Sequence, residues 1–292
     1  MPGRKPAPTI RLRRLAAELR RLREDADLTR EEVVERTGIN TATLYRIEAA
    51  RVRPQPRTLA TLLEVYRAPE PKRAELSTLL KDAKQRSWLN TLASELPEHY
   101  ASYIEFETEA NAVLNYECLF VPGLLQTEDY ARAVIQGTLP DATKDEVENR
   151  VEARMRRQAI LAGDDPLTFW GIVDEGALRR AVGGTDVMRA QLKHLLDVAQ
   201  QPNVTFQVVP FEAGAHVGMP GSFSLMRFPE AVGPDVVYID SQAGDIFLEE
   251  EVDTGRYTLV CEHLRAVALS PSASAELVAT VAKRGLSRGG AS

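Results

Sequence analysis

The sequence has few of the residues that build metal sites and disulfide frameworks, and it has no long apolar run. It has two cysteines, Cys118 and Cys261, and four histidines, none at metal-ligand spacing. We therefore expect no disulfide framework, no metal, no cofactor and a reducing, cytoplasmic environment near the nucleoid. No run approaches the roughly 18 apolar residues that cross a bilayer. The first ten residues lack the apolar segment of a signal peptide, so we expect no membrane partner.

Charge is unevenly distributed along the chain. Residues 1–90 contain 20 Lys and Arg against 12 Asp and Glu, whereas the other 202 residues contain 16 against 30. A basic N-terminal part can approach a polyanion that the acidic remainder would repel. We therefore expect only the N-terminal part to meet nucleic acid. The length of 292 residues allows about two domains, each with its own core.

Hydrophobic spacing in the N-terminal part predicts four or five short helices. Over residues 11–26, leucines and alanines recur at three- and four-residue intervals, and arginines fill the other face. Thr29 followed by Glu32 predicts a capping box at the start of a second helix, and Gly38 favours a left-handed end. Residues 57–68 and 72–88 carry further apolar stripes. The predicted fold of this part is all-α.

A third helix, after Gly38, is predicted to protrude from this bundle. Asn40 or Thr41 is placed to cap it, and Leu44 and Ile47 lie one turn apart, facing inward. Two short helices joined by a glycine turn are typical of a helix-turn-helix, whose second helix enters a DNA major groove. A plain bundle with solvated arginines is the alternative.

The outward residues suit contact with DNA. Small side chains let the helix backbone approach base edges, and Arg46 is long enough to reach the acceptors of a guanine. Arginines of the following loop are placed to clamp phosphates. For Tyr45, packing against its own helix is an equal alternative. The residues expected to contact DNA are Arg30, Asn40, Thr41, Ala42, Thr43, Tyr45, Arg46, Arg51, Arg53 and Arg57.

The segment "LTREEVVERTGINTATLYRIEAARVRPQPRTLATLLEVY" resembles the helix-turn-helix of the phage-repressor-like XRE family. Two departures stand out: Arg30 replaces the usual glutamine at the start of the second helix, and Ala50 replaces a frequent glycine. The resemblance implies that Arg23 and Glu48 form a buried ion pair joining the first helix to the third. Such a pair orients more reliably than it stabilises.

The acidic C-terminal part is predicted to be an α+β domain with a largely antiparallel sheet. Strands are expected at "LTFWGIV", "VTFQVVPF", "FSLMRF", "VVYID" and "GDIFLEE", joined by Gly, Pro and Asp turns. Helices are expected between the first two strands and at the end of the chain. The glycine-rich stretch Gly214–Gly221 precedes a strand, not a helix, so we interpret it as a long hairpin loop and not as a phosphate loop.

The same part shows no catalytic signature. It has neither a GxSxG elbow nor a Walker loop, and Asp174 beside Glu175 is better explained as a helix cap than as a catalytic pair. We therefore expect no enzyme. A binding pocket is the alternative to a simple core for the residues Trp170, Phe206, His216, Phe223 and Tyr238.

Residues 87–284 resemble the domain of unknown function that follows the helix-turn-helix in actinobacterial WhiJ-type regulators. Blocks such as "LFVPGLLQTEDYARAVI" and "NVTFQVVPFEAGAHVGMPGSFSLMRF" carry this resemblance. It implies a small companion protein as a partner, because genes of this type often lie beside genes for such proteins. A small-molecule effector is the other partner that we consider.

These observations predict a regulator of transcription, most simply a repressor, that binds a pseudo-palindromic operator in double-stranded DNA as a homodimer. The rival interpretation is an antitoxin-like DNA-binding protein that sequesters its companion. The expected organisation is a disordered arm (1–10), the helix-turn-helix domain (11–68), a linking helix (69–95), the α+β regulatory domain (96–285) and a disordered tail (286–292).

Overall fold

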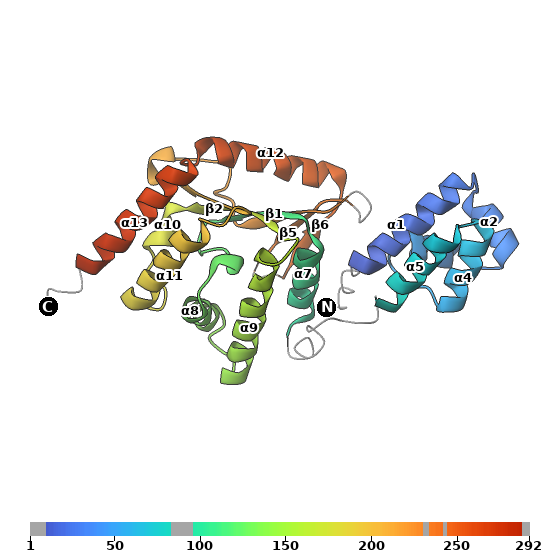
Figure 1. Cartoon of the computed structure of the whole chain (residues 1–292), viewed down its shortest axis with the longest axis horizontal. Coiled ribbons are helices and arrows are strands. Elements are labelled where there is room, and N and C mark those ends of the chain that lie inside the picture. The colour runs from blue at the N-terminus through green and yellow to red at the C-terminus, as the bar shows by residue number, and fades with distance from the viewer. Residues whose placement is uncertain (1–9, 83–95, 230–233, 242–243, 288–292) are drawn as a thin grey trace. The chain divides into compact units, whose positions relative to one another are not determined.

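A computed structural model of the chain describes residues 10–82, 96–229, 234–241 and 244–287 (Figure 1). The predicted arm and tail and the second half of the predicted linking helix lie largely or wholly outside these residues. The described part divides into two compact units. The first contains the N-terminal helices and Ala101–Glu109, and the second contains Ala110–Arg227 and the strands and helices from Asp235 onward.

The N-terminal unit is helical, as its hydrophobic spacing predicts. Its helices are α1 (Ile10–Asp25), α2 (Arg30–Thr37), α3 (Thr41–Glu48), α4 (Pro56–Val65) and α5 (Glu70–Asp82). Their apolar faces form one core, which contains the fully buried side chains Leu15, Leu19, Val33, Leu44, Ile47, Leu59, Leu62 and Leu76. Because all five helices contribute to this core, it holds α2 and α3 in place on the flanking helices.

The ends of α2 and α3 are fixed by local hydrogen bonds. Thr29 and Glu32 form the predicted capping box, and Gly38 ends α2 in the left-handed conformation at φ 71°. Asn40 Oδ1 then accepts a hydrogen bond from the backbone N–H of Ala42 at 2.9 Å, which caps α3. The turn between the two helices is therefore fixed by capping residues that can be recognised in the sequence.

The C-terminal unit is built on a six-stranded mixed sheet. Its strands are β1 (Ala112–Glu117), β2 (Thr168–Asp174), β3 (Val204–Val209), β4 (Phe223–Arg227), β5 (Val236–Ile239) and β6 (Ile246–Leu248). The order across the sheet is β3-β2-β1-β4-β5-β6. Strand β1 pairs in parallel with β2, and β2 with β3, whereas the other three pairings are antiparallel. The α+β class and the largely antiparallel sheet are confirmed.

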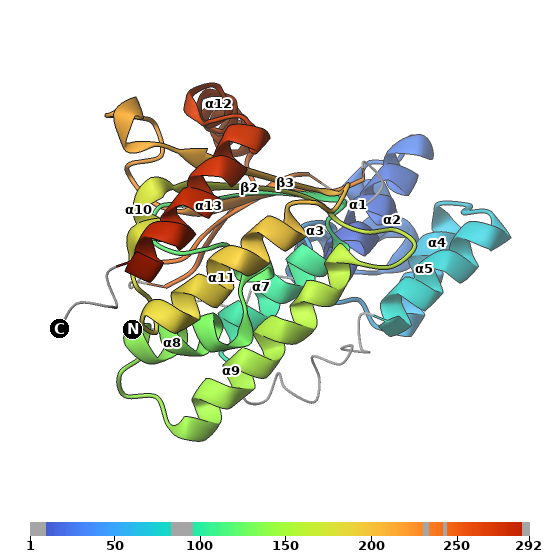
Figure 2. The same ribbon diagram turned by 60° about the vertical axis from the view of Figure 1, so that its left-hand side comes forward.

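Helices cover both faces of this sheet (Figures 1 and 2). Helix α12 (Glu251–Val267) lies on one face, where Cys261 and Leu264 pack against Tyr116, Phe223 and other strand residues. The opposite face is covered by α8 (Glu128–Thr138), α9 (Lys144–Arg157) and α11 (Thr185–Val198). Helix α13 (Pro271–Ser287) packs along α11 and β3. The remaining described elements are α7 (Glu98–Glu109), α10 (Glu175–Arg179), η1 (Gly123–Leu125), η2 (Gln158–Leu161) and η3 (Phe211–Ala213).

The interpretation of Gly214–Gly221 as a hairpin loop is wrong. Strands β3 and β4 are consecutive in the chain, but β2 and β1 lie between them in the sheet. The connecting segment crosses the ends of both strands. Phe211 N donates to the Glu175 carboxylate at 2.9 Å, and Cys118 N donates to Ser222 Oγ at 3.1 Å at the other end of the crossing. Gly218 packs directly on the Tyr116 ring, which leaves no room for a side chain.

Candidate nucleic-acid interface

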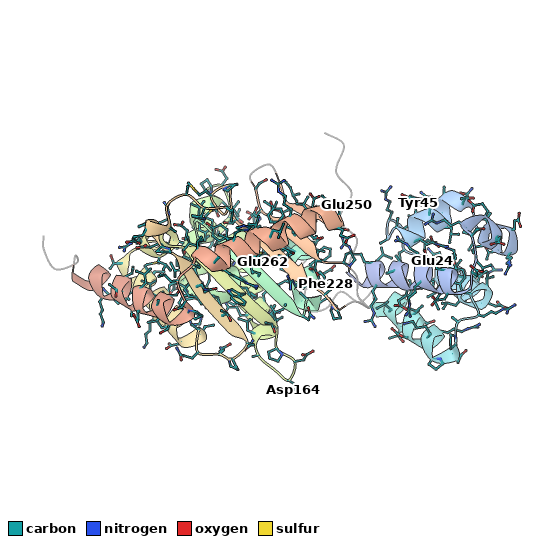
Figure 3. All side chains as sticks on the ribbon, turned by 90° about the horizontal axis from the view of Figure 1, so that it is seen from above. Glu24, Tyr45, Asp164, Phe228, Glu250 and Glu262 are labelled. Carbon is teal, nitrogen blue, oxygen red and sulfur yellow. The ribbon has the colours of Figure 1, made fainter. Side chains whose placement is uncertain are left out.

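Helix α3 presents a small, polar outer face. Leu44 and Ile47 are fully buried, whereas Thr41, Ala42, Tyr45 and Arg46 are exposed. Thr43 and Asn40 border this face. Figure 3 labels Tyr45, whose ring is 46% exposed and is the largest apolar side chain left open among the described residues of the N-terminal unit. The helix can therefore approach another surface closely along its first turn.

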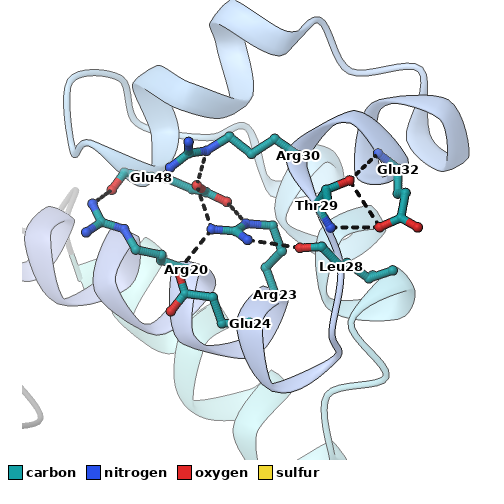
Figure 4. Close-up of polar contacts among 8 residues, drawn as sticks. All are labelled: Arg20, Arg23, Glu24, Leu28, Thr29, Arg30, Glu32 and Glu48. Atoms are coloured by element: carbon teal, nitrogen blue, oxygen red, sulfur yellow. Dashed lines mark hydrogen bonds and ion pairs between the residues drawn. The ribbon is translucent and has the colours of Figure 1, made fainter.

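A buried carboxylate fixes the far end of α3 (Figure 4). Glu48 is 1% exposed and accepts from Arg23 Nε at 2.7 Å and from Arg30 Nε at 2.7 Å. The backbone carbonyl of Glu48 accepts from Arg20 at 2.8 Å. The structure thus brings Arg23 and Glu48 together. Three arginines from α1 and α2 converge on the last residue of α3, which fixes how far this helix projects.

The electrostatics of this cluster favour a charged Arg23. Burial disfavours the charge, but the hydrogen bond to Glu48 and the nearby carboxylates outweigh burial and raise the pKa of the Arg23 guanidinium. Arg23 also donates to the Leu28 carbonyl at 2.9 Å, so its position is fixed on two sides. Burial and the charge of Glu48 raise the pKa of the neighbouring Tyr66 hydroxyl. Arg23 therefore brings a permanent positive charge into the base of α3.

Sequence reasoning missed the contact between Arg30 and Glu48. Arg30 stands where the pattern that this segment resembles has glutamine, and its side chain is 36% exposed. Its guanidinium lies 5.6 Å from the centre of the Tyr45 ring, and that of Arg51 lies 5.8 Å from the same centre. Two guanidinium groups therefore lie within cation–π range of the Tyr45 ring. The sequence did contain a signal for this contact: an arginine at position 30, in place of the usual glutamine, puts a long cationic side chain near a buried acid.

The other arginines expected to contact DNA differ in their exposure and in the hydrogen bonds that they already make. Arg46 lies back on its own helix, donating to the Ala42 carbonyl at 3.2 Å and to Thr43 Oγ1 at 3.4 Å, both at the surface. Arg51 and Arg57 are exposed, the latter in the first turn of α4. Arg53 donates to the backbone carbonyl of Leu80, so it ties its loop to α5. This bond competes with its expected role as a phosphate clamp.

Backbone strain marks the chain just after α3. Ala50, where the resembling family often has glycine, adopts φ 54°, in the left-handed region. This conformation costs an L-residue with a Cβ about 1 kcal/mol or more. The Ala50 methyl group is buried, and this apolar burial offsets part of the cost. A glycine at position 50, as in the pattern that this segment resembles, would adopt this conformation without that cost.

The five residues expected to line a pocket in the C-terminal part do not share one site. The strand register puts Trp170 and Phe223 on the sheet face under α12, and Phe206 and Tyr238 on the opposite face. Phe206 and Phe223 are buried in the core. His216 lies at the strand ends, with Nε2 3.4 Å from Asp174. A common pocket is thus excluded, because neighbouring residues of a strand point to opposite faces.

Two partners hold the Trp170 side chain in place. Arg265 stacks over the Trp170 ring at 3.7 Å, and the Trp170 indole N–H donates to Gln207 Oε1 at 2.8 Å.

His216 Nδ1 accepts from Gly218 N at 3.2 Å. Within the described residues, no group of three His, Cys, Asp or Glu is placed to hold a metal ion. No described helix is long and apolar enough to cross a bilayer.

The fold of the first unit and the exposed face of α3 define a helix-turn-helix DNA-binding regulator. A family model for a helix-turn-helix domain matches residues 14–76. The chain belongs to the family that carries the domain of unknown function DUF5753, whose model matches residues 100–280, more than half of the chain. Searches among curated proteins and solved structures found no match.

Proposed function

We propose that this protein is a sequence-specific, non-enzymatic regulator of transcription that places α3 in the major groove of double-stranded DNA. One observation carries the proposal: α3 buries Leu44, Ile47 and Glu48 and leaves only small or hydrogen-bonding residues on its outer side. A helix held this way can touch base edges without first moving away from its own core. The basic charge of residues 1–90 supplies the attraction to phosphate.

The contacts divide into base reading and phosphate binding. Arg46 is the base reader, because the two hydrogen bonds that it makes within the described residues lie at the surface, and both can be exchanged for a guanine. Thr41, Ala42 and Thr43 face the groove beside it, near Asn40. Tyr45 makes a further contact at the edge of this face.

Phosphate binding falls to exposed cations around α3. Arg51 and Arg57 have exposed side chains, and Arg57 lies in the first turn of α4, where free backbone N–H groups add to the attraction. Arg30 combines its contact to Glu48 with a side chain that is still 36% exposed. Arg53 contributes less, since it already donates to Leu80.

The operator is a pseudo-palindrome bound by a homodimer. One recognition helix covers too few base pairs for selectivity in a genome, and two copies related by a two-fold axis read two half-sites. The resemblance to XRE-family and actinobacterial WhiJ-type proteins supports a cytoplasmic repressor acting at the nucleoid.

The proposal is tested by selecting DNA from a random pool with the full chain and footprinting the enriched sequence. We expect one protected region with two related half-sites, bound far more tightly than shuffled DNA of the same composition. Enrichment without a shared sequence, or protection that shuffling does not abolish, would contradict the proposal.

The C-terminal domain then serves as the regulatory part, through a small ligand or a partner protein. Four exposed apolar residues support a binding role: Leu119, Phe211, Val217 and Met219 all lie in segments next to the ends of β1, β3 and β4. The alternative is an antitoxin-like protein that sequesters a small companion. Purification from the native host separates them, because a stoichiometric small protein supports the antitoxin-like function and a bound metabolite supports a ligand sensor.

A further inference from the structure

Helix α12 carries an outer stripe that the C-terminal unit does not cover. Its inner side packs on the sheet through Tyr257, Cys261 and Leu264. The outer side exposes large apolar side chains, with Val252 84% and Leu259 56% exposed. Figure 3 looks onto this outer side, where Glu262 is labelled. The α12 stripe consists of the exposed residues Val252, Gly255, Arg256, Leu259, Glu262, His263 and Ala266.

The α12 stripe is symmetric about Leu259. Its members lie three, four and seven positions before and after this residue, the spacing of one face of an α-helix. If a second α12 lies antiparallel to the first with a two-fold axis at Leu259, each position meets its mirror position. Leu259 then faces itself, which places an apolar contact on the axis.

The facing positions are complementary in charge. Arg256 meets Glu262 of the second copy, and the two-fold axis produces this pair twice. Within the described part of the chain, neither Arg256 nor Glu262 forms an ion pair. Both charges are therefore available for a partner.

The facing positions are also complementary in size. Gly255, where an added Cβ would meet no neighbouring atom within 4 Å, meets His263, and Ala266 meets Val252. Each small residue thus faces a larger one, which allows the two helices to pack closely. The other charged groups on the outer side are Glu251 and, partly exposed, Asp253. Glu251 falls opposite Val267, so no like charges face each other across the axis.

We propose that α12 is the surface through which two copies of this chain pair, antiparallel and about a two-fold axis at Leu259. A pair of 17-residue helices buries less than the roughly 1,200 Å² at the lower limit of stable interfaces. The dimer is therefore weak and depends on protein concentration. DNA with two half-sites completes it, so dimerisation couples to operator occupancy.

Charge reversal tests the pairing with the full chain, by sedimentation velocity over a concentration series without DNA. Arg256→Glu gives two facing pairs of carboxylates, and Glu262→Arg gives two facing pairs of guanidinium groups. An attractive exposed ion pair raises the association constant up to about fivefold, and a repulsive pair lowers it. Each variant alone should therefore dimerise roughly tenfold or more weakly than the parent. All substituted side chains are exposed, so folding should be unaffected.

The decisive sample is an equimolar mixture of the two single variants. In a mixed dimer, the glutamate that Arg256→Glu introduces in one copy meets the arginine that Glu262→Arg introduces in the other, and native Glu262 meets native Arg256. The mixture should therefore dimerise far better than either variant alone and approach the parent, held below it because encounters between like copies stay repulsive; the double variant should dimerise like the parent. The control Glu276→Arg makes the same charge change on the exposed side of α13 and should leave dimerisation unchanged.

Several results would overturn the pairing: a parent that stays monomeric up to high micromolar concentration, single variants that dimerise like the parent, or a mixture no better than its components. The test is separate from that of the proposed function. Loss of dimerisation in the single variants with recovery in the mixture supports the interface even if no specific DNA site is found. A specific DNA site, together with a mixture that pairs no better than its components, leaves the proposed function standing and overturns the interface.

Discussion

Removing the charge of Glu48 should be far more damaging than removing that of its neighbour Glu24. Both carboxylates accept from Arg23, at 2.7 Å and 3.2 Å, but their side chains are 1% and 59% exposed. Glu48→Gln leaves the buried guanidinium of Arg23 without its main counter-ion, which costs about 3 to 5 kcal/mol. Glu24→Gln removes a solvent-screened pair and costs at most about 1 kcal/mol.

The free energy of unfolding of the N-terminal unit can be read from amide hydrogen exchange of its most protected residues. A difference of about 3 kcal/mol corresponds to exchange roughly a hundredfold faster in Glu48→Gln than in Glu24→Gln. Arg30→Ala, which removes a half-exposed partner of Glu48, should lie close to the Glu24 variant. Equal exchange in Glu48→Gln and Glu24→Gln would refute the view that a buried ion pair holds α3.

Two further predictions concern the C-terminal unit. Gly218→Ala puts a Cβ 2.5 Å from Tyr116 Cζ, so the buried ring must move. The free energy of unfolding should fall by about 1 to 3 kcal/mol. In the control Gly137→Ala, on α8, the added methyl group has free space, so thermal unfolding should show an unchanged or higher stability. Burial raises the pKa of Glu117 from 4.5 to about 7. Between these two pH values the folded state keeps a proton on Glu117 that the unfolded chain releases. The contribution of Glu117 to the free energy of unfolding is therefore full below pH 4.5 and is lost as the pH rises through about 7. Glu117→Gln should flatten this dependence in urea unfolding; an unchanged slope would contradict it.

The N-terminal unit can be predicted from its sequence because its determinants are local. A threonine and a glutamate three residues apart cap α2, a glycine ends it, and an asparagine caps α3. Leu44 and Ile47 face inward as their spacing predicts. What the sequence does not reveal is which arginines are already engaged, since the bonds of Arg30 to Glu48 and of Arg53 to Leu80 join residues 18 and 27 positions apart.

The C-terminal unit is harder to predict for a topological reason. Helices α11, α12 and α13 and the Asp174 cap are confirmed. The central strand β1 was missed, because an apolar run buried on both faces has no alternating pattern to distinguish it from a helix. Without β1, strands β3 and β4 were expected to be adjacent. Their real separation changes the expected hairpin into a crossing segment and places the aromatic residues on opposite faces.

The measurement that tests the central claim most directly is the ratio of affinities for the selected site and for shuffled DNA, in the parent and in Arg46→Ala. If α3 reads bases, Arg46→Ala should lower affinity for the selected site about 10- to 100-fold and leave shuffled DNA nearly unchanged. Arg57→Ala, at a proposed phosphate contact, should weaken both by the same factor. Equal losses on both DNAs for Arg46→Ala would show that the outer face of α3 does not read sequence.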